Sequence, residues 1–187
     1  MTALAFFRAM NFLVAENFFS ADECARLRDE MRSGESRNAT VARERADAYS
    51  VDENLRRTRR IYVSESAAQS VTASLDAFRP RAATHFNIPL SETETPQFLL
   101  YRPGDFFVRH ADRDPDGVNR RAVSIIAFLN DDFEGGALKF YGGVEDKLLT
   151  LTLQPAEGLL IGFRSEWLHE VEPVTAGERF TIVSWYA

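Results

Sequence analysis

The chain has 187 residues, of which 45% are hydrophobic and 27% are charged, and its formal net charge is −6. That length is enough for one well-buried domain and short for two. The acidic balance argues against a general nucleic-acid binder, although it allows local basic patches.

Cysteine usage and hydropathy bear on the compartment. Cys24 is the only cysteine, so no internal disulfide forms and a reducing environment fits. The apolar start of the chain is interrupted by Arg8, Asn11 and Glu16 and lacks a small-residue cleavage site, which argues against a signal peptide. No apolar run approaches the length that spans a membrane. We therefore expect a cytoplasmic, soluble protein.

Residues 5–19 predict one or two strands. The candidates for burial there are Phe6, Phe12, Val14 and Phe18. The next segment, Ser20-Ala-Asp-Glu23, has the pattern of a capping box and predicts a helix that ends at Ser33-Gly34. The apolar stripe of this helix is Cys24, Leu27 and Met31. On such a stripe a cysteine is expected to be a buried, inert thiol.

Residues 35–60 are polar, charged and weakly periodic, and they end in Arg56-Arg57-Thr58-Arg59-Arg60. Such a stretch favours a solvated loop or an edge hairpin. A second interpretation is a mobile lid over a site, in which the arginines meet an anionic substrate. Contact with nucleic acid ranks last because the chain is acidic. Residues 61–63 predict a short strand.

A second helix is predicted from Ser66-Ala-Ala-Gln69, which again resembles a capping box. Pro80 is expected to bend or end this helix. His85 lies beyond it, and we expect a surface or packing histidine because no carboxylate stands at ligand spacing from it. The apolar residues at helical spacing are Val71, Leu75 and Phe78.

Turn-forming residues are concentrated in the second half of the chain, where nine of the ten glycines follow residue 100. From Gln97 onward, short apolar runs separated by glycine turns predict eight strands. They cover residues 97–102, 105–112, 120–129, 136–141, 147–153, 157–163, 168–174 and 179–186. Eight strands in two antiparallel sheets form a jelly roll, here of the double-stranded β-helix type. We predict this mainly β fold, with the two helices packed on the outside of one sheet.

The chemistry of the second half centres on Arg109-His110-Ala111-Asp112. Because a strand presents every second side chain on one face, His110 and Asp112 project together. An imidazole beside a carboxylate supplies two-thirds of a facial triad, which leaves open positions on a ferrous ion. His169 is available as the third ligand from a distant strand. Arg179, ten residues further on, is a planar donor suited to a bidentate grip on a carboxylate.

Three segments carry a resemblance to a known family. They are FLLYRPGDFFVRHAD at 98–112, RRAVSIIAFLNDDFEGGALKFYGG at 120–143 and LHEVEPVTAGERFTIVSWY at 168–186. In this order they resemble the prolyl 4-hydroxylase-like branch of the 2-oxoglutarate- and Fe(II)-dependent oxygenases, which includes the oxygen-sensing prolyl hydroxylases. The resemblance covers about residues 96–187 and implies that they form the jelly-roll catalytic core. Because neither half of the chain offers a closed core of its own, we predict one domain over residues 1–187, in which residues 1–95 supply supporting helices and strands and a possible lid.

The resemblance also implies a role for each site residue. Fe(II) is held by His110, Asp112 and His169. The cosubstrates are 2-oxoglutarate and O2, and Arg179 binds the distal carboxylate of 2-oxoglutarate; without the motif around it, Arg179 is equally an ordinary strand-end salt bridge. Thr181 shares the face of Arg179 and adds a hydroxyl donor. Tyr101 matches a tyrosine that contacts the cosubstrate, with a satisfied core tyrosine as the alternative.

The chain departs from the family pattern at two positions. Many relatives have Tyr-Leu-Asn where this chain has Phe128-Leu129-Asn130, so one hydroxyl is missing, and Tyr101 or Thr181 is the candidate to compensate. Collagen-type relatives place a lysine where Arg179 stands, which puts this chain closer to the arginine-using branch. Trp185 falls on the same strand face and either lines the pocket or packs in the core.

The implied activity is hydroxylation of an unactivated C–H bond, coupled to decarboxylation of 2-oxoglutarate to succinate. The substrate is a peptidyl prolyl or similar side chain, or a free small molecule, and the sequence does not choose between them. A nucleic-acid dealkylating oxygenase is discounted, because that branch has a second arginine where this chain has Trp185. The halogenating branch lacks the ligand carboxylate that Asp112 provides. A non-catalytic metal-binding jelly-roll module is disfavoured, because structural metal sites are usually closed by protein ligands.

Overall fold

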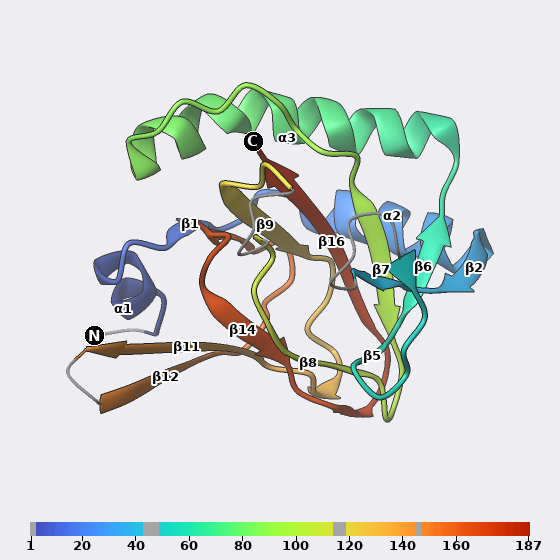
Figure 1. Ribbon diagram of the computed structural model, residues 1–187. Coiled ribbons are helices and arrows are strands. Elements are labelled where there is room, and N and C mark those ends of the chain that lie inside the picture. The colour runs from blue at the N-terminus through green and yellow to red at the C-terminus, as the bar shows by residue number, and fades with distance from the viewer. Residues whose placement is uncertain (1–2, 43–48, 114–118, 145–146) are drawn as a thin grey trace.

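The computed structural model of the protein describes residues 3–42, 49–113, 119–144 and 147–187. Two antiparallel sheets face each other, one of seven strands and one of five (Figure 1). The predicted mainly β jelly roll with supporting helices is therefore confirmed.

The seven-stranded sheet runs through both halves of the chain. In spatial order its strands are β1 (Leu13–Ala15), β13 (Leu160–Arg164), β9 (Val123–Phe128), β16 (Arg179–Tyr186), β7 (Gln97–Tyr101), β6 (Arg59–Tyr62) and β2 (Glu35–Asn38). Strands from the N-terminal half therefore extend this sheet at both of its edges.

The five-stranded sheet lies opposite. Its order is β12 (Lys147–Leu153), β11 (Leu138–Val144), β14 (Leu168–Val171), β8 (Phe106–His110) and β5 (Arg56–Arg57). Two further pairs are β10 (Glu134–Gly135) with β15 (Val174–Ala176), and β3 (Val41–Ala42) with β4 (Tyr49–Ser50). Each of the eight predicted strand regions contains a strand, but 168–174 is divided between β14 and β15, because Pro173 has no N–H to continue a ladder.

Alternation along the strands sorts the core into two layers. In β7, Phe98 and Leu100 point to one side, where they join buried residues of the helices. Leu99 and Tyr101 point to the other side, into the space between the two sheets. The inner layer, where the five-stranded sheet contributes residues such as Phe140, is the side that carries the candidate site.

Two helices cover the outer face of the seven-stranded sheet, as predicted (Figure 1). Helix α2 (Ala21–Ser33) begins with the predicted capping box, in which Ser20 and Glu23 satisfy each other's backbone N–H. Its stripe is buried, which confirms the predicted burial of Cys24, and burial raises the pKa of that thiol to about 11.

Helix α3 (Glu65–Phe86) begins earlier than predicted and contains Pro80, so the alternative in which Pro80 ends the helix is wrong. Its N-cap is Ser64 rather than Ser66, because the Ser64 hydroxyl accepts from Ala67 N–H. The helix continues past Pro80, and Ala82 and Phe86 in its last turns are buried against the sheet. His85 packs against Phe86, with ring centroids 4.7 Å apart, which confirms a packing histidine.

The prediction of strands from residue 5 is wrong for the first turns, which form helix α1 (Ala3–Ala9). The sequence there, ALAFFRA, is rich in alanine, which is a strong helix former. Phe7 is buried, whereas Phe6 is 37% exposed. The other three candidates lie at or next to β1: Phe12 and Val14 are buried, and Phe18 is half-buried. None of the helices in the described part of the chain is long and apolar enough to cross a membrane.

The arginine-rich segment 35–60 is built into the edges of both sheets. Strands β2 and β6 pair antiparallel at the edge of the seven-stranded sheet, and β5 pairs with β8 of the other sheet. The predicted edge position is therefore found, but β2 and β6 are not a simple hairpin, because β3, β4 and β5 lie between them in the chain. Residues 43–48 lie outside the described residues. The hypothesis that residues 35–60 form a mobile lid is weakened, because β5 and β6 are each hydrogen-bonded into a sheet.

Candidate active site

The three predicted metal ligands lie close together in space. His110 is the last residue of β8, Asp112 follows it, and His169 lies in β14 directly opposite His110 in the ladder. His110 Nε2 lies 3.7 Å from Asp112 Oδ1, and His169 Nε2 lies 3.5 Å from Asp112 Oδ2. Among the described residues, this is the cluster of histidine, cysteine and acidic side chains that is compact enough to share one ion.

Backbone carbonyls orient both imidazoles. Nδ1 of His110 lies 2.8 Å from the carbonyl oxygen of Val108, and Nδ1 of His169 lies 2.9 Å from that of Trp167. Each Nδ1 therefore carries the proton, which leaves the lone pair of Nε2 directed at Asp112 and free to bind a metal. Phe107 stacks on His110 with centroids 3.6 Å apart and limits rotation of that ring.

Asp112 is held as an ionised carboxylate. Burial opposes its charge, but the neighbouring His169 and His110 and the Ser124 hydroxyl bring its pKa below the usual range. Ser124 donates to Asp112 Oδ2 at 2.7 Å. Burial and the nearby His169 also lower the pKa of His110, so its imidazole is neutral. Two imidazole nitrogens beside an ionised carboxylate are a donor set that fits Fe(II) and leaves positions open for exogenous ligands.

Arg179 carries a buried charge, and no acidic side chain among the described residues forms an ion pair with it. It is 1% exposed, and burial lowers the pKa of its guanidinium to about 10. Its Nε and Nη2 have no hydrogen-bond partner within the described part of the chain. An unpaired buried guanidinium is costly, so the site is built for an anion that approaches with two oxygens.

The surroundings of Arg179 are aromatic. Its guanidinium carbon lies 4.9 Å from the ring centroid of Tyr101 and 5.2 Å from that of Phe128. Thr181 lies next to Phe128 in the ladder between β16 and β9, and its hydroxyl is 3.4 Å from Arg179 Nη1. Thr181 thus places a hydroxyl beside the position where Phe128 lacks one. Gly136, at φ +60°, makes room for the arginine, since a Cβ there would lie 3.0 Å from Arg179 Cδ.

The metal cluster and Arg179 open into one cavity of about 320 Å³. Trp185 lines it, which is the first of the two positions left open by the sequence, and its indole N–H has no partner among the described residues. Arg121 stacks on this ring at 3.6 Å and forms two 2.8 Å hydrogen bonds to Glu94. The structure therefore brings together all six predicted site residues: His110, Asp112, His169, Arg179, Tyr101 and Thr181.

Comparison with known proteins relates the segment that forms most of this cavity to a family. A model described as the 2OG-Fe(II) oxygenase superfamily matches residues 96–187, the segment that carries the triad and Arg179. Residues 96–187 form a 2OG-Fe(II) oxygenase domain.

Relatives within the superfamily are hydroxylases. The chain is 40% identical over 96 residues to a PKHD-type hydroxylase of Sphingopyxis alaskensis, which covers 48% of this chain and 42% of that protein. It is 38% identical over 76 residues to prolyl 3-hydroxylase 1 of Gallus gallus, covering 40% of this chain and 10% of that protein. The chain thus spans less than half the length of these curated relatives.

Similarity to solved structures extends over nearly the whole chain. A prolyl-4-hydroxylase of Pseudomonas putida superposes with a TM-score of 0.75 at 26% identity, covering 99% of this chain and 98% of that one. A prolyl hydroxylase of Trichoplax adhaerens, solved with a hypoxia inducible factor peptide fragment, has a TM-score of 0.77 at 22% identity, covering 98% and 86%. The second likeness concerns the fold alone.

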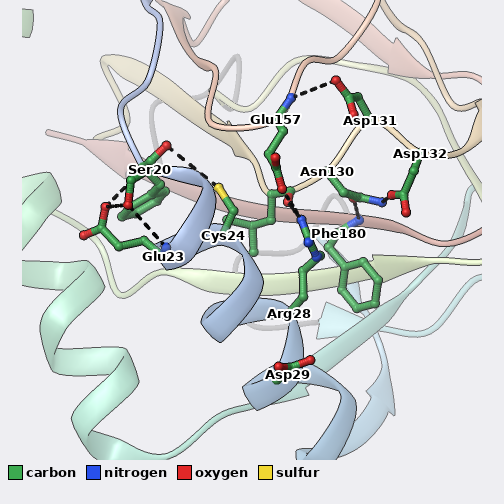
Figure 2. A network of polar contacts seen from close by, with 12 residues as sticks. Ser20, Glu23, Cys24, Arg28, Asp29, Asn130, Asp131, Asp132, Glu157 and Phe180 are labelled. Atoms are coloured by element: carbon green, nitrogen blue, oxygen red, sulfur yellow. Dashed lines mark hydrogen bonds and ion pairs between the residues drawn. The ribbon is translucent and has the colours of Figure 1, made fainter.

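Sequence analysis missed one residue that positions the oxygenase site. The side chain of Asn130 accepts from Phe180 N–H at 2.9 Å and donates to the carbonyl of Glu178 at 2.7 Å, so it bonds to the backbone on both sides of Arg179. Figure 2 shows this contact within a wider polar network. There Arg28 of helix α2 pairs with Glu157 and donates to the carbonyl of Leu129. The network ties the end of β9 to the start of β16.

We expect Asn130→Ala to weaken 2-oxoglutarate binding roughly tenfold while metal affinity is retained. The substitution leaves the Phe180 N–H buried without an acceptor, at about 1–3 kcal/mol, and frees the backbone that aims Arg179. Isothermal titration of Zn(II)-loaded protein with 2-oxoglutarate measures the effect. Asp132→Asn, which changes only the outer partner of the Asn130 amide, is the control and should bind normally. Equal affinity in both variants would mean that Asn130 supports stability alone.

Proposed function

We propose that the protein is a 2-oxoglutarate- and Fe(II)-dependent dioxygenase that hydroxylates an unactivated C–H bond. The observation that carries this proposal is the pairing, in one cavity, of an open three-ligand cluster with a buried arginine whose Nε and Nη2 have no partner among the described residues. When bound, Fe(II) and 2-oxoglutarate supply the oxidising power that delivers one oxygen atom of O2 to the substrate, with succinate and carbon dioxide as coproducts.

The protein's own residues bind, orient and exclude water. We assign His110, Asp112 and His169 to Fe(II), with the Nδ1 bonds of the histidines fixing the ligand geometry. Arg179, assisted by the hydroxyl of Thr181, would hold the distal carboxylate of 2-oxoglutarate. Tyr101 and Phe128, at 2% and 0% exposure, shield that ion pair from water and strengthen it. From this assignment we infer that the chain belongs to the arginine-using branch.

The substrate is proposed from the relatives. Their names are those of prolyl and PKHD-type hydroxylases, and one fold relative was solved with a peptide. A peptidyl prolyl or similar side chain is therefore the first candidate for this chain, and a free small molecule of the same chemistry is the second. A non-catalytic metal module fits less well, because structural metal sites are usually closed by protein ligands and do not require a buried arginine beside them.

Turnover of 2-oxoglutarate tests the function. Purified protein loaded anaerobically with Fe(II) is mixed with air and 2-oxoglutarate, and succinate is quantified. A mass-spectrometric screen across proline-containing peptides and free amino acids then searches for products heavier by one oxygen. We expect slow succinate formation alone and faster formation with a substrate. Metal binding without any 2-oxoglutarate consumption would favour the non-catalytic module.

A further inference from the structure

A second arginine in the cavity has no role in the reaction described above. Arg56 lies in the edge strand β5, where it pairs with Phe107 of β8. It is 9% exposed and lines the cavity, whereas Arg57 is exposed and lies over the ring of Phe106 at 5.8 Å. Because successive side chains of a strand point to opposite faces, Arg56 points into the cavity and Arg57 points away from it.

The guanidinium of Arg56 is fixed in place but not neutralised. Its Nη1 donates to the carbonyl of Thr40 at 3.0 Å, and its guanidinium carbon lies 4.7 Å from the centroid of Phe107. Its Nε is buried without a hydrogen-bond partner, and no acidic side chain of the described residues forms an ion pair with it. Burial lowers the pKa of Arg56, and the nearby Tyr101 and Asp112 only partly oppose this.

A charge balance of the loaded cavity shows what Arg56 lacks. The positive charges of Fe(II) and Arg179 are matched by the carboxylate of Asp112 and the two carboxylates of 2-oxoglutarate. Arg121 is neutralised by Glu94. Arg109 is exposed, so solvent screens its charge. Among the described lining residues, Arg56 is then the buried cation that remains unmatched when metal and cosubstrate are bound.

The neighbourhood of Arg56 also suits a partly apolar ligand. Leu55, which is 43% exposed, and Val108 line the same part of the cavity. A substrate with an anionic group for Arg56 thus meets apolar side chains next to that group. A planar guanidinium whose buried Nε lacks a hydrogen-bond partner among the described residues favours a carboxylate over a neutral amide.

We propose that Arg56 is a specificity-determining residue that binds a carboxylate of the substrate. The inference rests on the proposed function, because it assumes that the hydroxylation substrate enters this cavity beside 2-oxoglutarate. The carboxylate belongs to a small carboxylic acid or to an acidic residue of a peptide. Both sources offer the same chemistry to Arg56, and the probes below distinguish them.

Binding to Zn(II)-loaded protein saturated with 2-oxoglutarate tests the proposal without turnover. The probes are N-acetyl amino acids covering the common side chains, each beside its neutral amide, and the dipeptides acetyl-Asp-Pro-amide and acetyl-Asn-Pro-amide. Ligand-observed NMR reports their affinities. Wild type is expected to prefer an acid over its amide by roughly tenfold or more, in the free-acid series or in the aspartyl dipeptide. A wild type without any acid preference overturns the proposal.

Arg56→Gln should abolish this preference, with acid and amide binding equally weakly, while Arg57→Gln, one residue along the strand, should retain it. Arg56 lies over the ring of Phe107, which in turn stacks on the metal ligand His110, so a substitution could disturb the metal site. Zn(II) affinity and thermal unfolding are therefore measured for each variant. If Arg56→Gln does not fold, Arg56→Lys replaces it and should reduce the preference by its loss of planar geometry. An acid preference unchanged by the substitution overturns the proposal. Loss of 2-oxoglutarate affinity in Arg56→Gln also overturns it, since Arg56 would then serve the cosubstrate. Failure of wild type to bind 2-oxoglutarate contradicts the proposed function itself.

Discussion

His110→Ala and His169→Ala are each expected to lose Fe(II) affinity by more than roughly a hundredfold and to abolish succinate formation. Changing only the hydrogen-bond partner of a metal ligand typically costs about tenfold to a hundredfold in affinity, and loss of the ligand itself costs more. The two nitrogens lie 3.7 Å and 3.5 Å from the oxygens of Asp112, so either deletion leaves one nitrogen and one carboxylate. Two ligands cannot define the open facial geometry.

Anaerobic titration with Fe(II) measures the effect, and the third histidine supplies a matched control. His85 packs on Phe86 at the end of α3, so His85→Ala should bind iron and turn over 2-oxoglutarate like wild type. Circular dichroism confirms that each variant is folded. If His110→Ala and His169→Ala both bound iron with wild-type affinity, the metal would lie elsewhere.

The site was predictable where local spacing determines direction. His110 and Asp112 project together because of strand alternation, and Arg179, Thr181 and Trp185 share a face for the same reason. All of these residues line one cavity. The long-range step, which joins His169 to His110 across β14 and β8, came from resemblance to a family and not from spacing.

The misses concern features that depend on tertiary contacts. Arg56 and Arg57 are indistinguishable in a run of arginines, because the register with β8 decides which one points inward. The roles of Asn130 and Arg28 depend on loops brought together by the fold. Helix α3 continues past Pro80 because the burial of Phe86 and Ala82 offsets the lost backbone bond, which no local rule about proline includes. Propensity does favour a helix at 3–9, so α1 was missed by choosing the wrong period.

Arg179→Met is expected to weaken cosubstrate binding without lowering the stability of the unliganded protein. Loss of one partner of a buried carboxylate–guanidinium pair typically costs about 2–5 kcal/mol. That corresponds to a loss of 2-oxoglutarate affinity of roughly thirtyfold to several thousandfold. In the absence of cosubstrate, however, Arg179 is an uncompensated buried charge, and its Nε and Nη2 lack partners within the described residues. A methionine of similar length removes that penalty, so the unliganded variant should unfold at the same temperature as wild type or higher.

Thermal unfolding of Zn(II)-loaded protein with and without 2-oxoglutarate measures both effects at once. Wild type should be stabilised by the ligand in proportion to the logarithm of its concentration, whereas Arg179→Met should show almost no shift at the same concentration. Arg102→Ala is the control: its exposed ion pair with Glu178 lies next to Arg179 in the structure but outside the cavity, and the ligand shift should persist. A wild-type shift in Arg179→Met would mean that another cation anchors the cosubstrate. Arg56 would then be the remaining buried candidate, and the same experiment on Arg56→Gln would decide between the two.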